Sequence, residues 1–337
     1  MAKIHVLLLF GGESPEHEVS ISSAKNVYDA IDKQKYITQL CYITSEGIWH
    51  AVDSVRKAIA SDVTLSAALG EKSFLVGNKK IKPDVILPIL HGQNGEDGSV
   101  QALAQLLHIP IAGPSLLSAV VAMDKDITKK LLTAADLPVV DWIVIHKTSS
   151  YPSYETITKH LGDNLFVKPV GTGSSVGVSK VLSGADYDKA IRLAFSHGEK
   201  IIIESAVENA REIEVAIIGN QQPQASIPGE IVPGQEFYSY EDKYDDSSQA
   251  AVKVPAELDE ATQGTIKRMA LRAYKAAEGH GMARIDFFLT QDGKIYLNEI
   301  NTIPGFTNIS MYPKLWRHSG LEYPELIDKL IQLALEK

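Results

Sequence analysis

A hairpin in the last quarter of the sequence constrains the fold more than any other segment. Residues 283–290 and 295–301 are two runs rich in Ile, Phe, Leu and Tyr, with an Asp-Gly pair at 292–293 between them. An Asp-Gly pair between such runs is a strong signal for a β-hairpin. A two-residue loop pairs Gln291 with Lys294, and this pairing predicts which residues face each other along both strands.

This register brings four polar side chains to one face of the sheet. Asp286 is predicted to lie opposite Glu299, and Arg284 opposite Asn301, because alternate side chains of a strand share a face. Two facing carboxylates repel each other unless a cation neutralises them, and oxygen ligands suit Mg²⁺ that is shared with substrate phosphates. As a metal ligand, Asp286 is expected to be exposed and to contribute little to packing. The alternative is an exposed hairpin edge with a charged face, and a slip of one residue removes the arrangement.

The composition is that of an ordinary globular protein. A length of 337 residues indicates two or three domains. With 33 Lys and Arg against 42 Asp and Glu, the net charge is −9, so we expect neither nucleic acid nor a membrane as partner. The single cysteine, Cys41, excludes an intramolecular disulfide and fits a reducing compartment. The sequence has no apolar run of about 18 residues and no signal-peptide pattern, so we expect a cytoplasmic protein.

The first third of the sequence predicts an open parallel sheet. Strand-like and helix-like segments alternate there, at residues 4–10, 19–31, 37–43, 84–90 and 99–107. Ligands of such sheets gather at the carboxyl ends of the strands. The glycine-containing segments 11–12 and 91–98 both follow predicted strands, so we expect them to line one cleft.

Two further regions complete the expected organisation. A helix over residues 123–135 begins a small α+β region, which includes a strand at 176–181. The chain then becomes mainly strands, with an amphipathic helix at 323–336. We therefore expect three domains, at residues 1–120, 121–206 and 207–337.

Residues 166–177 place a lysine at a strand end before a loop rich in Gly and Ser. Glycines let backbone N–H groups converge on an anion, hydroxyl groups add donors, and Lys168 adds a positive charge. The loop is not a Walker A motif, because neither Lys-Ser nor Lys-Thr follows its last glycine. A plain flexible turn is the alternative, but the metal site expected at the hairpin favours a phosphate-binding loop.

Other candidate nucleotide contacts are weak when each is taken alone. Lys125 opens a helix and is able to reach a phosphate, although most such lysines are solvated. Glu204 ends an apolar strand whose connection, 205–207, has backbone suited to an adenine edge, but an empty buried strand looks the same. Glu212 is able to accept hydrogen bonds from a ribose, whereas an exposed strand carboxylate is more common.

The segments that follow the strands add candidate substrate contacts. Residues 13–18 hold three carboxylates and an imidazole, and Glu16 among them is able to bind an ammonium group. The same acidic residues also favour a helix N-terminus without any ligand. His91, at another strand end, is either a structural or a functional histidine.

Two later loops have a composition that suits catalysis. Residues 237–248 are aromatic and charged, and Lys243 or Tyr244 can close over a substrate and exclude water; a surface loop is the alternative. Residues 301–310 form a turn whose backbone N–H groups can face an oxyanion.

Taken together, seven segments resemble the D-alanine:D-alanine ligases of the ATP-grasp superfamily, in the same order and over nearly the whole chain. They are residues 11–20, 91–98, 123–125, 168–177, 240–244, 284–286 and 298–305. The resemblance implies an ATP-grasp fold of α/β and α+β class, preceded by a Rossmann-like N-terminal domain, in a three-domain homodimer. It also implies ATP-dependent joining of two D-alanines, through an acylphosphate and a tetrahedral intermediate, for peptidoglycan precursor synthesis.

The resemblance further implies roles for the matched positions, with ATP as a substrate and two Mg²⁺ ions that Mn²⁺ is able to replace. The implied metal ligands are Asp286, Glu299 and Asn301. The implied nucleotide contacts are Lys125, Lys168, Ser175, Glu204, Ser205, Ala206, Val207, Glu212 and Lys243. The implied catalytic residues are Glu16, Ser174, Tyr244, Arg284 and Gly305. The implied contacts to D-alanine are Glu16, His91, Arg284, Ser310 and Met311.

Three alternatives to this function remain. In the first two, the second substrate is D-lactate or D-serine instead of D-alanine. In the third, the chain is a catalytically silent nucleotide-binding ATP-grasp protein. Tyr244 favours D-alanine, because members of the family that use D-lactate commonly differ at this lid position. The presence of Lys168, Arg284 and all three implied metal ligands argues against a silent protein.

Overall fold

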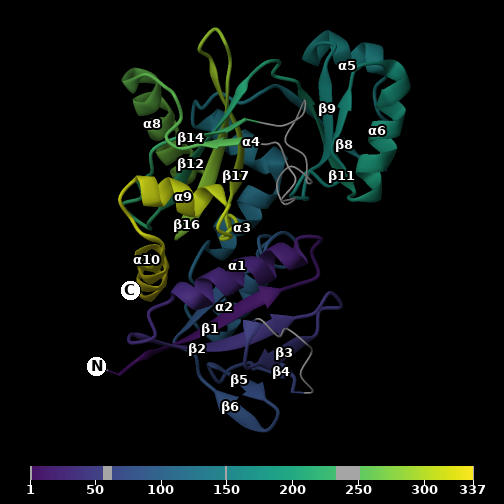
Figure 1. The fold of residues 1–337 in the computed structure, drawn as a ribbon. Coiled ribbons are helices and arrows are strands. Elements are labelled where there is room, and N and C mark those ends of the chain that lie inside the picture. Colours follow the sequence, from purple (N-terminus) through teal and green to yellow (C-terminus); the bar gives the residue numbers. More distant parts are fainter. Residues whose placement is uncertain (1, 56–62, 149, 233–250, 337) are drawn as a thin grey trace.

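The computed structural model describes residues 2–55, 63–148, 150–232 and 251–336 (Figure 1). The strands in these ranges form four sheets. Figure 1 shows the N-terminal sheet below, the C-terminal sheet above it and the central sheet to one side. Among the helices described, none is long and apolar enough to cross a membrane.

The N-terminal sheet is built around β1 (Ile4–Gly11). This strand pairs in parallel with β2 (Tyr36–Ile43) and β7 (Val85–Ile89), which confirms the expected parallel sheet. An additional strand, β3 (Trp49–Val52), pairs antiparallel with β2 at the edge. Residues 6–10 of β1 are fully buried, because both faces of the sheet are covered.

Different elements cover the two faces of this sheet. On one face, α1 (His17–Ala30) packs against the core together with the C-terminal helix α10 (Tyr323–Leu335). On the other face, α2 (Ser99–Leu107) packs against alternate residues of β1. A small sheet that the sequence analysis missed also covers that face; its strands are β4 (Leu65–Ala68), β5 (Ser73–Val76) and β6 (Lys79–Ile81). These strands are too short to show a period.

The helix predicted at 123–135 is in fact the second of two helices. The first is α3 (Leu116–Met123), and Asp124 separates it from α4 (Lys125–Ala134). The Asp124 carboxylate accepts hydrogen bonds from the backbone N–H groups of Asp126 and Ile127, as an N-cap does. This cap fixes the start of α4 and therefore the position of Lys125.

The central sheet is antiparallel and carries its helices on one face. Its strands, in order across the sheet, are β10 (Ser179–Val181), β9 (Leu165–Pro169), β11 (Lys200–Ser205) and β8 (Trp142–His146). Two helices pack on it, α5 (Tyr154–Leu161) and α6 (Gly184–Ser196). Val167 and Ile203 point into the core beneath these helices. Because side chains alternate, Lys168 and Glu204 point to the opposite face. The strand predicted at 176–181 is confined to its last three residues.

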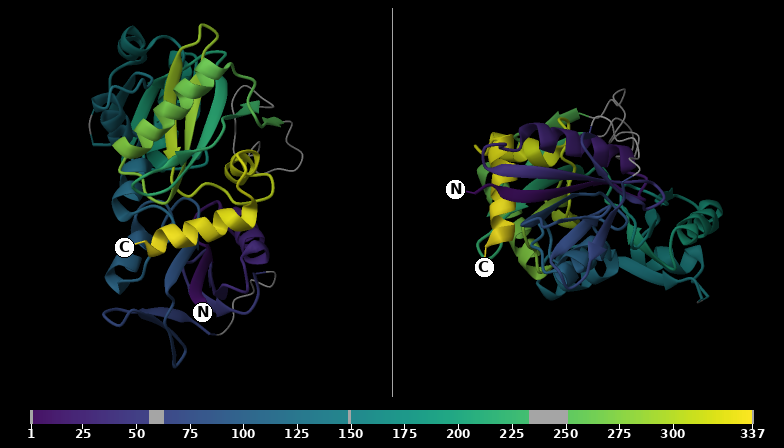
Figure 2. Two further views of the ribbon diagram at one scale, coloured as in Figure 1. Left: turned by 90° about the vertical axis from the view of Figure 1, so that its left-hand side faces the viewer. Right: turned by 90° about the horizontal axis from the view of Figure 1, so that it is seen from below.

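The C-terminal sheet is also antiparallel. Its strands, in order, are β15 (Ala251–Lys253), β14 (Gly229–Val232), β12 (Arg211–Ile218), β16 (Met282–Leu289) and β17 (Ile295–Asn301), and β13 (Gln224–Ala225) pairs with β12. Helix α8 (Glu260–Ala276) packs on one face. Residues of α9 (Met311–His318) and α10 share a single core with β1, β7 and α1. Figure 2 shows α10 lying between the N-terminal and C-terminal units, so these two units are joined by common packing.

The hairpin of β16 and β17 has the predicted register at its functional end but not at its loop. Thr290, not Gln291, pairs with Lys294, so the loop has three residues and Gly293 adopts a left-handed φ of 81°. The register then shifts between Asp286 and Phe287, where Asn298 is the additional residue of β17. This bulge compensates for the longer loop. Asp286 therefore faces Glu299, and Arg284 faces Asn301, as predicted.

Candidate active site

Two adjoining cavities lie between the sheets. The larger has a volume of about 510 Å³ and is lined by residues of both the central and the C-terminal sheet. The smaller, of about 90 Å³, is lined by residues of the C-terminal sheet and of the N-terminal unit. Five residues line both cavities and mark where they meet: Gly173, Ser174, Glu214, Arg284 and Glu299.

The larger cavity brings together every predicted nucleotide contact that the structure describes. These residues are Lys125, Lys168, Ser175, Glu204, Ser205, Ala206, Val207 and Glu212. Asp286 and Glu299 line the same cavity, so acidic and basic groups share it. A cavity of this size lies within the usual range for small-molecule sites. Lys243 and Tyr244 lie outside the described residues.

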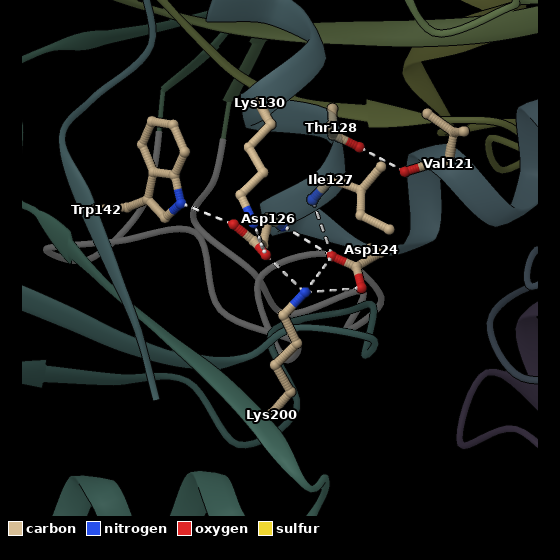
Figure 3. A network of polar contacts seen from close by, with 8 residues as sticks. All are labelled: Val121, Asp124, Asp126, Ile127, Thr128, Lys130, Trp142 and Lys200. Carbon is tan, nitrogen blue, oxygen red and sulfur yellow. Dashed lines mark hydrogen bonds and ion pairs between the residues drawn. The ribbon is translucent and has the colours of Figure 1, made fainter. Parts of the chain in front are cut away.

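A network of ion pairs surrounds the start of α4 (Figure 3). Lys200 from β11 lies 3.1 Å from Asp124 and 2.7 Å from Asp126. Burial works against the charge of Asp126, but hydrogen bonds from Lys130, Lys200 and the Trp142 indole lower its pKa to about 2. The network ties α4 to the central sheet, at the rim of the larger cavity.

The Lys125 side chain in turn reaches the glycine loop. Its ammonium donates a hydrogen bond of 2.6 Å to the Thr172 carbonyl. In the same loop Ser174 and Ser175 have positive φ values of 49° and 59°, a backbone conformation that residues other than glycine rarely adopt. Both serines line the larger cavity. Successive left-handed residues turn the backbone sharply at the cavity wall, and such loops are able to bind an anion through their N–H groups.

Glu204 sits between two lysines, one buried (Lys129) and one partly buried at the cavity wall (Lys168). Its carboxylate lies 2.6 Å from the Lys168 ammonium and 2.9 Å from the Lys129 ammonium. Burial raises the pKa of Glu204, but the two cations outweigh it and lower the pKa to about 2. Burial lowers the pKa of Lys168, yet the attraction of Glu204 leaves it above its ordinary value. The cluster carries a net positive charge on the side of the cavity where the central sheet ends, which favours an anionic ligand.

Lys129 was not among the predicted site residues. It is 1% exposed and also donates a hydrogen bond of 3.2 Å to the Val140 carbonyl. In the sequence it is one of several lysines of an amphipathic helix, and only the fold places it beneath Glu204.

Arg284 lies where the two cavities meet and pairs with two carboxylates. It donates hydrogen bonds of 2.8 and 2.7 Å to Asp286, and its Nε lies 3.0 Å from Glu214. Burial opposes the charge, but the surrounding carboxylates raise the pKa of Arg284 well above its ordinary value. Glu214 is a further site residue that the sequence analysis did not select. The guanidinium is therefore permanently charged at the junction.

The three predicted metal ligands are two carboxylates and one side-chain amide. Asp286 and Glu299 line the larger cavity, while Asn301 lines the smaller cavity and donates a hydrogen bond of 2.9 Å to Asp286. In the described part of the chain, no group of three His, Cys, Asp or Glu side chains is arranged to hold a metal by itself. Two carboxylates and an amide suit Mg²⁺, which takes few protein ligands and shares the rest with phosphates and water.

The smaller cavity brings together the predicted substrate contacts and the predicted catalytic residues that the structure describes. They are Glu16, His91, Ser174, Arg284, Gly305, Ser310 and Met311. Glu16 follows β1 at the start of α1 and is only 7% exposed. Ser310 precedes α9, and its hydroxyl accepts a hydrogen bond of 3.0 Å from the Thr307 N–H.

Glu96 also lines the smaller cavity, although the sequence analysis placed only its loop near the cleft. Its carboxylate accepts hydrogen bonds from the backbone N–H groups of Gly92, at 2.7 Å, and Ile303, at 3.0 Å. Burial and the nearby Glu16 carboxylate raise the pKa of Glu96 to about 8. His91 is buried beside it, and burial lowers the pKa of its imidazole.

The fold and the paired cavities define the class of the protein, which is an ATP-dependent ligase of the ATP-grasp type. Two family models match the chain: the one described as D-ala D-ala ligase N-terminus covers residues 5–114, and the one described as D-ala D-ala ligase C-terminus covers residues 131–332. The chain belongs to the D-alanine–D-alanine ligase family, which confirms the resemblance seen in the sequence.

Similar proteins cover the chain from end to end. A D-alanine–D-alanine ligase of Proteus mirabilis is 44% identical over 354 aligned positions, which span 100% of this chain and 96% of that protein. D-alanine–D-alanine ligase A of Salmonella typhimurium is also 44% identical and is covered to 97% of its length.

Solved structures agree with the ATP-grasp fold. The D-alanine-D-alanine ligase from Coxiella burnetii superposes with a TM-score of 0.89 at 36% identity, over 99% of this chain and 94% of that one. The VanG D-Ala:D-Ser ligase from Enterococcus faecalis superposes with a TM-score of 0.91 at 33% identity, over 99% of this chain and 100% of that one.

Proposed function

We propose that this protein joins two D-alanine molecules with ATP, to form the D-alanyl-D-alanine used in peptidoglycan precursor synthesis. The observation that carries the proposal is the junction of a nucleotide-sized cavity with a much smaller one at Arg284. At such a junction, the carboxylate of a small amino acid is able to meet the terminal phosphate of a nucleotide. The full-length similarity to D-alanine–D-alanine ligases supports D-alanine as that amino acid.

The larger cavity would hold ATP. Lys125, Lys168 and, from outside the described residues, Lys243 would contact the phosphates, together with Ser175 of the glycine loop. Glu204, which pairs with Lys168, and residues 205–207 would bind adenine in the same cavity. Glu212 would accept hydrogen bonds from the ribose. This division is supported by the cationic cluster around Lys168 and by the common cavity that these positions line.

Asp286, Glu299 and Asn301 would hold two Mg²⁺ ions, for which Mn²⁺ can substitute. The ions would neutralise phosphate charge as the phosphoryl group is transferred. The donor chemistry of these residues fits such ions. The direct ion pair of Asp286 with Arg284 limits the negative charge at this point of the site.

The smaller cavity would hold both amino acids. Glu16 would bind the ammonium group of the first D-alanine, whose carboxylate lies near His91 and attacks the γ-phosphate. ADP leaves, and the product is an acylphosphate. The amine of the second D-alanine, after losing a proton, then attacks the acyl carbon, and Ser310 with Met311 would bind its carboxylate.

Collapse of the resulting tetrahedral intermediate releases phosphate and the dipeptide. The charge that develops on its oxygen would be stabilised by Arg284 and by the Gly305 N–H, both of which line the smaller cavity. Ser174 would link Glu16 to Tyr244 of the lid, and the closed lid would keep water from the acylphosphate. No protein nucleophile is required.

The remaining expectations complete the proposal. The domains would be residues 1–120, 121–206 and 207–337, with the N-terminal and C-terminal domains in contact through a common core. The protein would act as a homodimer in the cytoplasm, with D-alanine and ATP as its small-molecule partners.

The identity of the second substrate has one specific competitor. The likeness to a D-Ala:D-Ser ligase structure makes D-serine an outcome to test, and D-lactate is another. Purified protein with ATP and Mg²⁺ is assayed for ADP release and for dipeptide, with D-alanine alone and then with D-serine, D-lactate or L-alanine added. We expect D-alanyl-D-alanine from D-alanine alone. Product only with D-serine or D-lactate would contradict the proposed substrate, and ATP binding without ADP release would indicate a silent nucleotide-binding protein.

A further inference from the structure

The segment that leaves β17, residues 303–306, forms part of the wall of the smaller cavity. Ile303, Pro304 and Gly305 all line this cavity. The segment has no strand or helix hydrogen bonding of its own, so other groups must hold its backbone. Its position decides where the Gly305 N–H lies relative to the substrate.

Side chains of the N-terminal unit hold the first residue of the segment. The Ile303 N–H donates a hydrogen bond of 3.0 Å to Glu96, and the Ile303 carbonyl lies 3.0 Å from Nδ1 of His91. The N–H and the carbonyl of Ile303 are therefore both bound by side chains of the loop after β7.

Side chains of α1 and α10 hold the last residue of the segment. The Phe306 N–H donates a hydrogen bond of 3.2 Å to the Ser23 hydroxyl. The Phe306 carbonyl accepts one of 2.7 Å from the Tyr323 hydroxyl. Gly305 thus lies between two residues whose backbone groups are fixed from outside the segment.

A contact between Ser23 and His91 joins the two ends. The Ser23 hydroxyl lies 3.3 Å from Nε2 of His91, and the two side chains are 0% and 4% exposed. One arrangement of protons satisfies every group. Phe306 donates to the Ser23 oxygen, Ser23 donates to Nε2 of His91, and Nδ1–H of His91 donates to the Ile303 carbonyl. In this tautomer His91 has no N–H left for a substrate carboxylate.

We propose that Ser23 and His91 are positioning residues that act through the 303–306 segment to set the Gly305 N–H for the tetrahedral intermediate. This inference rests on the proposed ligase reaction and assigns Ser23 a part in it. His91 lies beside the first substrate but acts on the reaction through Ile303. Because the contacts cross from α1 to the segment after β17, the N-terminal unit contributes to the chemistry by orienting a donor as well as by binding an ammonium group.

Ser20 offers a matched control on the same helix. It is also 0% exposed, and its hydroxyl accepts a hydrogen bond of 2.8 Å from the Gly11 N–H and donates one to the Ile89 carbonyl. These partners lie in β1 and β7, so Ser20 makes the same kind of contacts within the N-terminal unit. Ser20→Ala and Ser23→Ala remove equivalent groups, but only the second loosens the 303–306 segment.

The test compares dipeptide formation and thermal unfolding of wild type, Ser20→Ala and Ser23→Ala. A small misplacement of a catalytic group can cost about 100-fold in rate. We therefore expect Ser23→Ala to lower kcat by about tenfold or more, with the KM for ATP unchanged. Ser20→Ala should lower the unfolding temperature comparably while its kcat stays near wild type. Ser23→Cys, which keeps the size of the side chain but has a weak donor and acceptor, replaces Ser23→Ala if that variant does not fold.

A double-mutant cycle separates positioning from independent effects. If Ser23 and His91 act through one segment, Ser23→Ala combined with His91→Phe should lower kcat little further than His91→Phe alone. The inference would be overturned if the kcat losses of the two single variants multiply in the double variant, or if Ser23→Ala and Ser20→Ala have equal kcat values. Either result would leave the ligase assignment intact. Absence of dipeptide from wild type would instead refute the proposed function, and the inference with it.

Discussion

Arg284 and Asp286, two residues apart on β16, form an ion pair joined by two parallel hydrogen bonds of 2.8 and 2.7 Å. Such bidentate pairs are strong and fix the orientation of both groups. Glu214 on the neighbouring strand lies 3.0 Å from the same guanidinium. The arginine is thus held at the junction of the cavities before any substrate binds, and it limits the repulsion between the carboxylates that surround it.

Replacing Asp286 with Asn should remove activity. The change keeps the shape of the side chain but removes the charge that would bind Mg²⁺. Loss of a residue that only hydrogen-bonds a metal ligand costs about 10–100-fold in metal affinity or activity. We therefore expect turnover to fall by about 100-fold or more when a ligand itself is changed. Asp292→Asn is the control, because Asp292 lies at the exposed tip of the same hairpin and pairs only with Lys294 among the ion pairs described. Binding of Mn²⁺ in the presence of ADP measures the site directly. Normal turnover and normal Mn²⁺ affinity would remove Asp286 from it.

The expectation that Asp286 is exposed is wrong, and this changes the predicted effect on stability. Asp286 is 9% exposed, and its ion pair with Arg284 is partly buried. Asp286→Asn should therefore lower the unfolding temperature as well, whereas Asp292→Asn should change it little.

Glu204→Gln should destabilise the protein more than Lys129→Met. The glutamine leaves the buried ammonium of Lys129 and the partly buried ammonium of Lys168 without a carboxylate, and breaking a buried pair costs about 3–5 kcal/mol. The methionine leaves Glu204 paired with Lys168, and its side chain fills a similar volume. Chemical unfolding of the two variants checks the order. A Lys129→Met variant less stable than Glu204→Gln would contradict this account of the cluster.

Glu96 should make the stability of the ligand-free protein fall as pH rises. Its folded pKa of about 8 lies above the ordinary value of 4.5, so protonated Glu96 favours the folded state. Its contribution is complete below about pH 4.5 and is lost as the pH rises through 8. The facing charges are Glu16, which raises the pKa, and Arg284, which lowers it.

The readout is the unfolding temperature of wild type minus that of Glu96→Gln, measured across this pH range. We expect the difference to decrease steadily, because glutamine does not titrate. A difference that is constant or increases with pH would show that Glu96 is not protonated in the folded protein near neutral pH.

Gly293→Ala should destabilise the hairpin without affecting catalysis. Gly293 has a φ of 81°, and a Cβ added there would meet no atom within 4 Å, so the cost comes from the backbone alone. A left-handed conformation costs a residue other than glycine about 1–2 kcal/mol, and asparagine less. Thermal unfolding should therefore rank wild type above Gly293→Asn, and Gly293→Asn above Gly293→Ala. Equal stability of all three would argue against the three-residue loop.

The hairpin illustrates what the sequence is able to predict. Its strands and the facing of Asp286 and Glu299 follow from alternation and from the Asp-Gly signal, but the loop length does not. The Thr290 hydroxyl accepts a hydrogen bond from the Lys294 N–H, which favours a three-residue loop. The bulge at Asn298 then restores the register. Asp286 and Glu299 therefore face each other as predicted, although the predicted length of the loop is wrong.

Contacts between distant segments could not be predicted in the same way. Lys129 lies under Glu204, and Ser23 contacts the backbone of Phe306, which is 283 residues away in sequence. Neither side chain belongs to a motif, and each owes its place to the packing of whole units. The residues found from the sequence are those that lie in glycine-rich loops or at strand ends, where local pattern and position in the fold coincide.

The central claim is that ATP activates the carboxylate of the first D-alanine. It is tested by supplying D-alanine labelled with ¹⁸O in both carboxylate oxygens and measuring the mass of the released phosphate. If the carboxylate attacks the γ-phosphate and the acylphosphate is then opened at its carbonyl carbon, each phosphate carries one ¹⁸O atom for each dipeptide formed. Unlabelled phosphate accompanying dipeptide would contradict the claim.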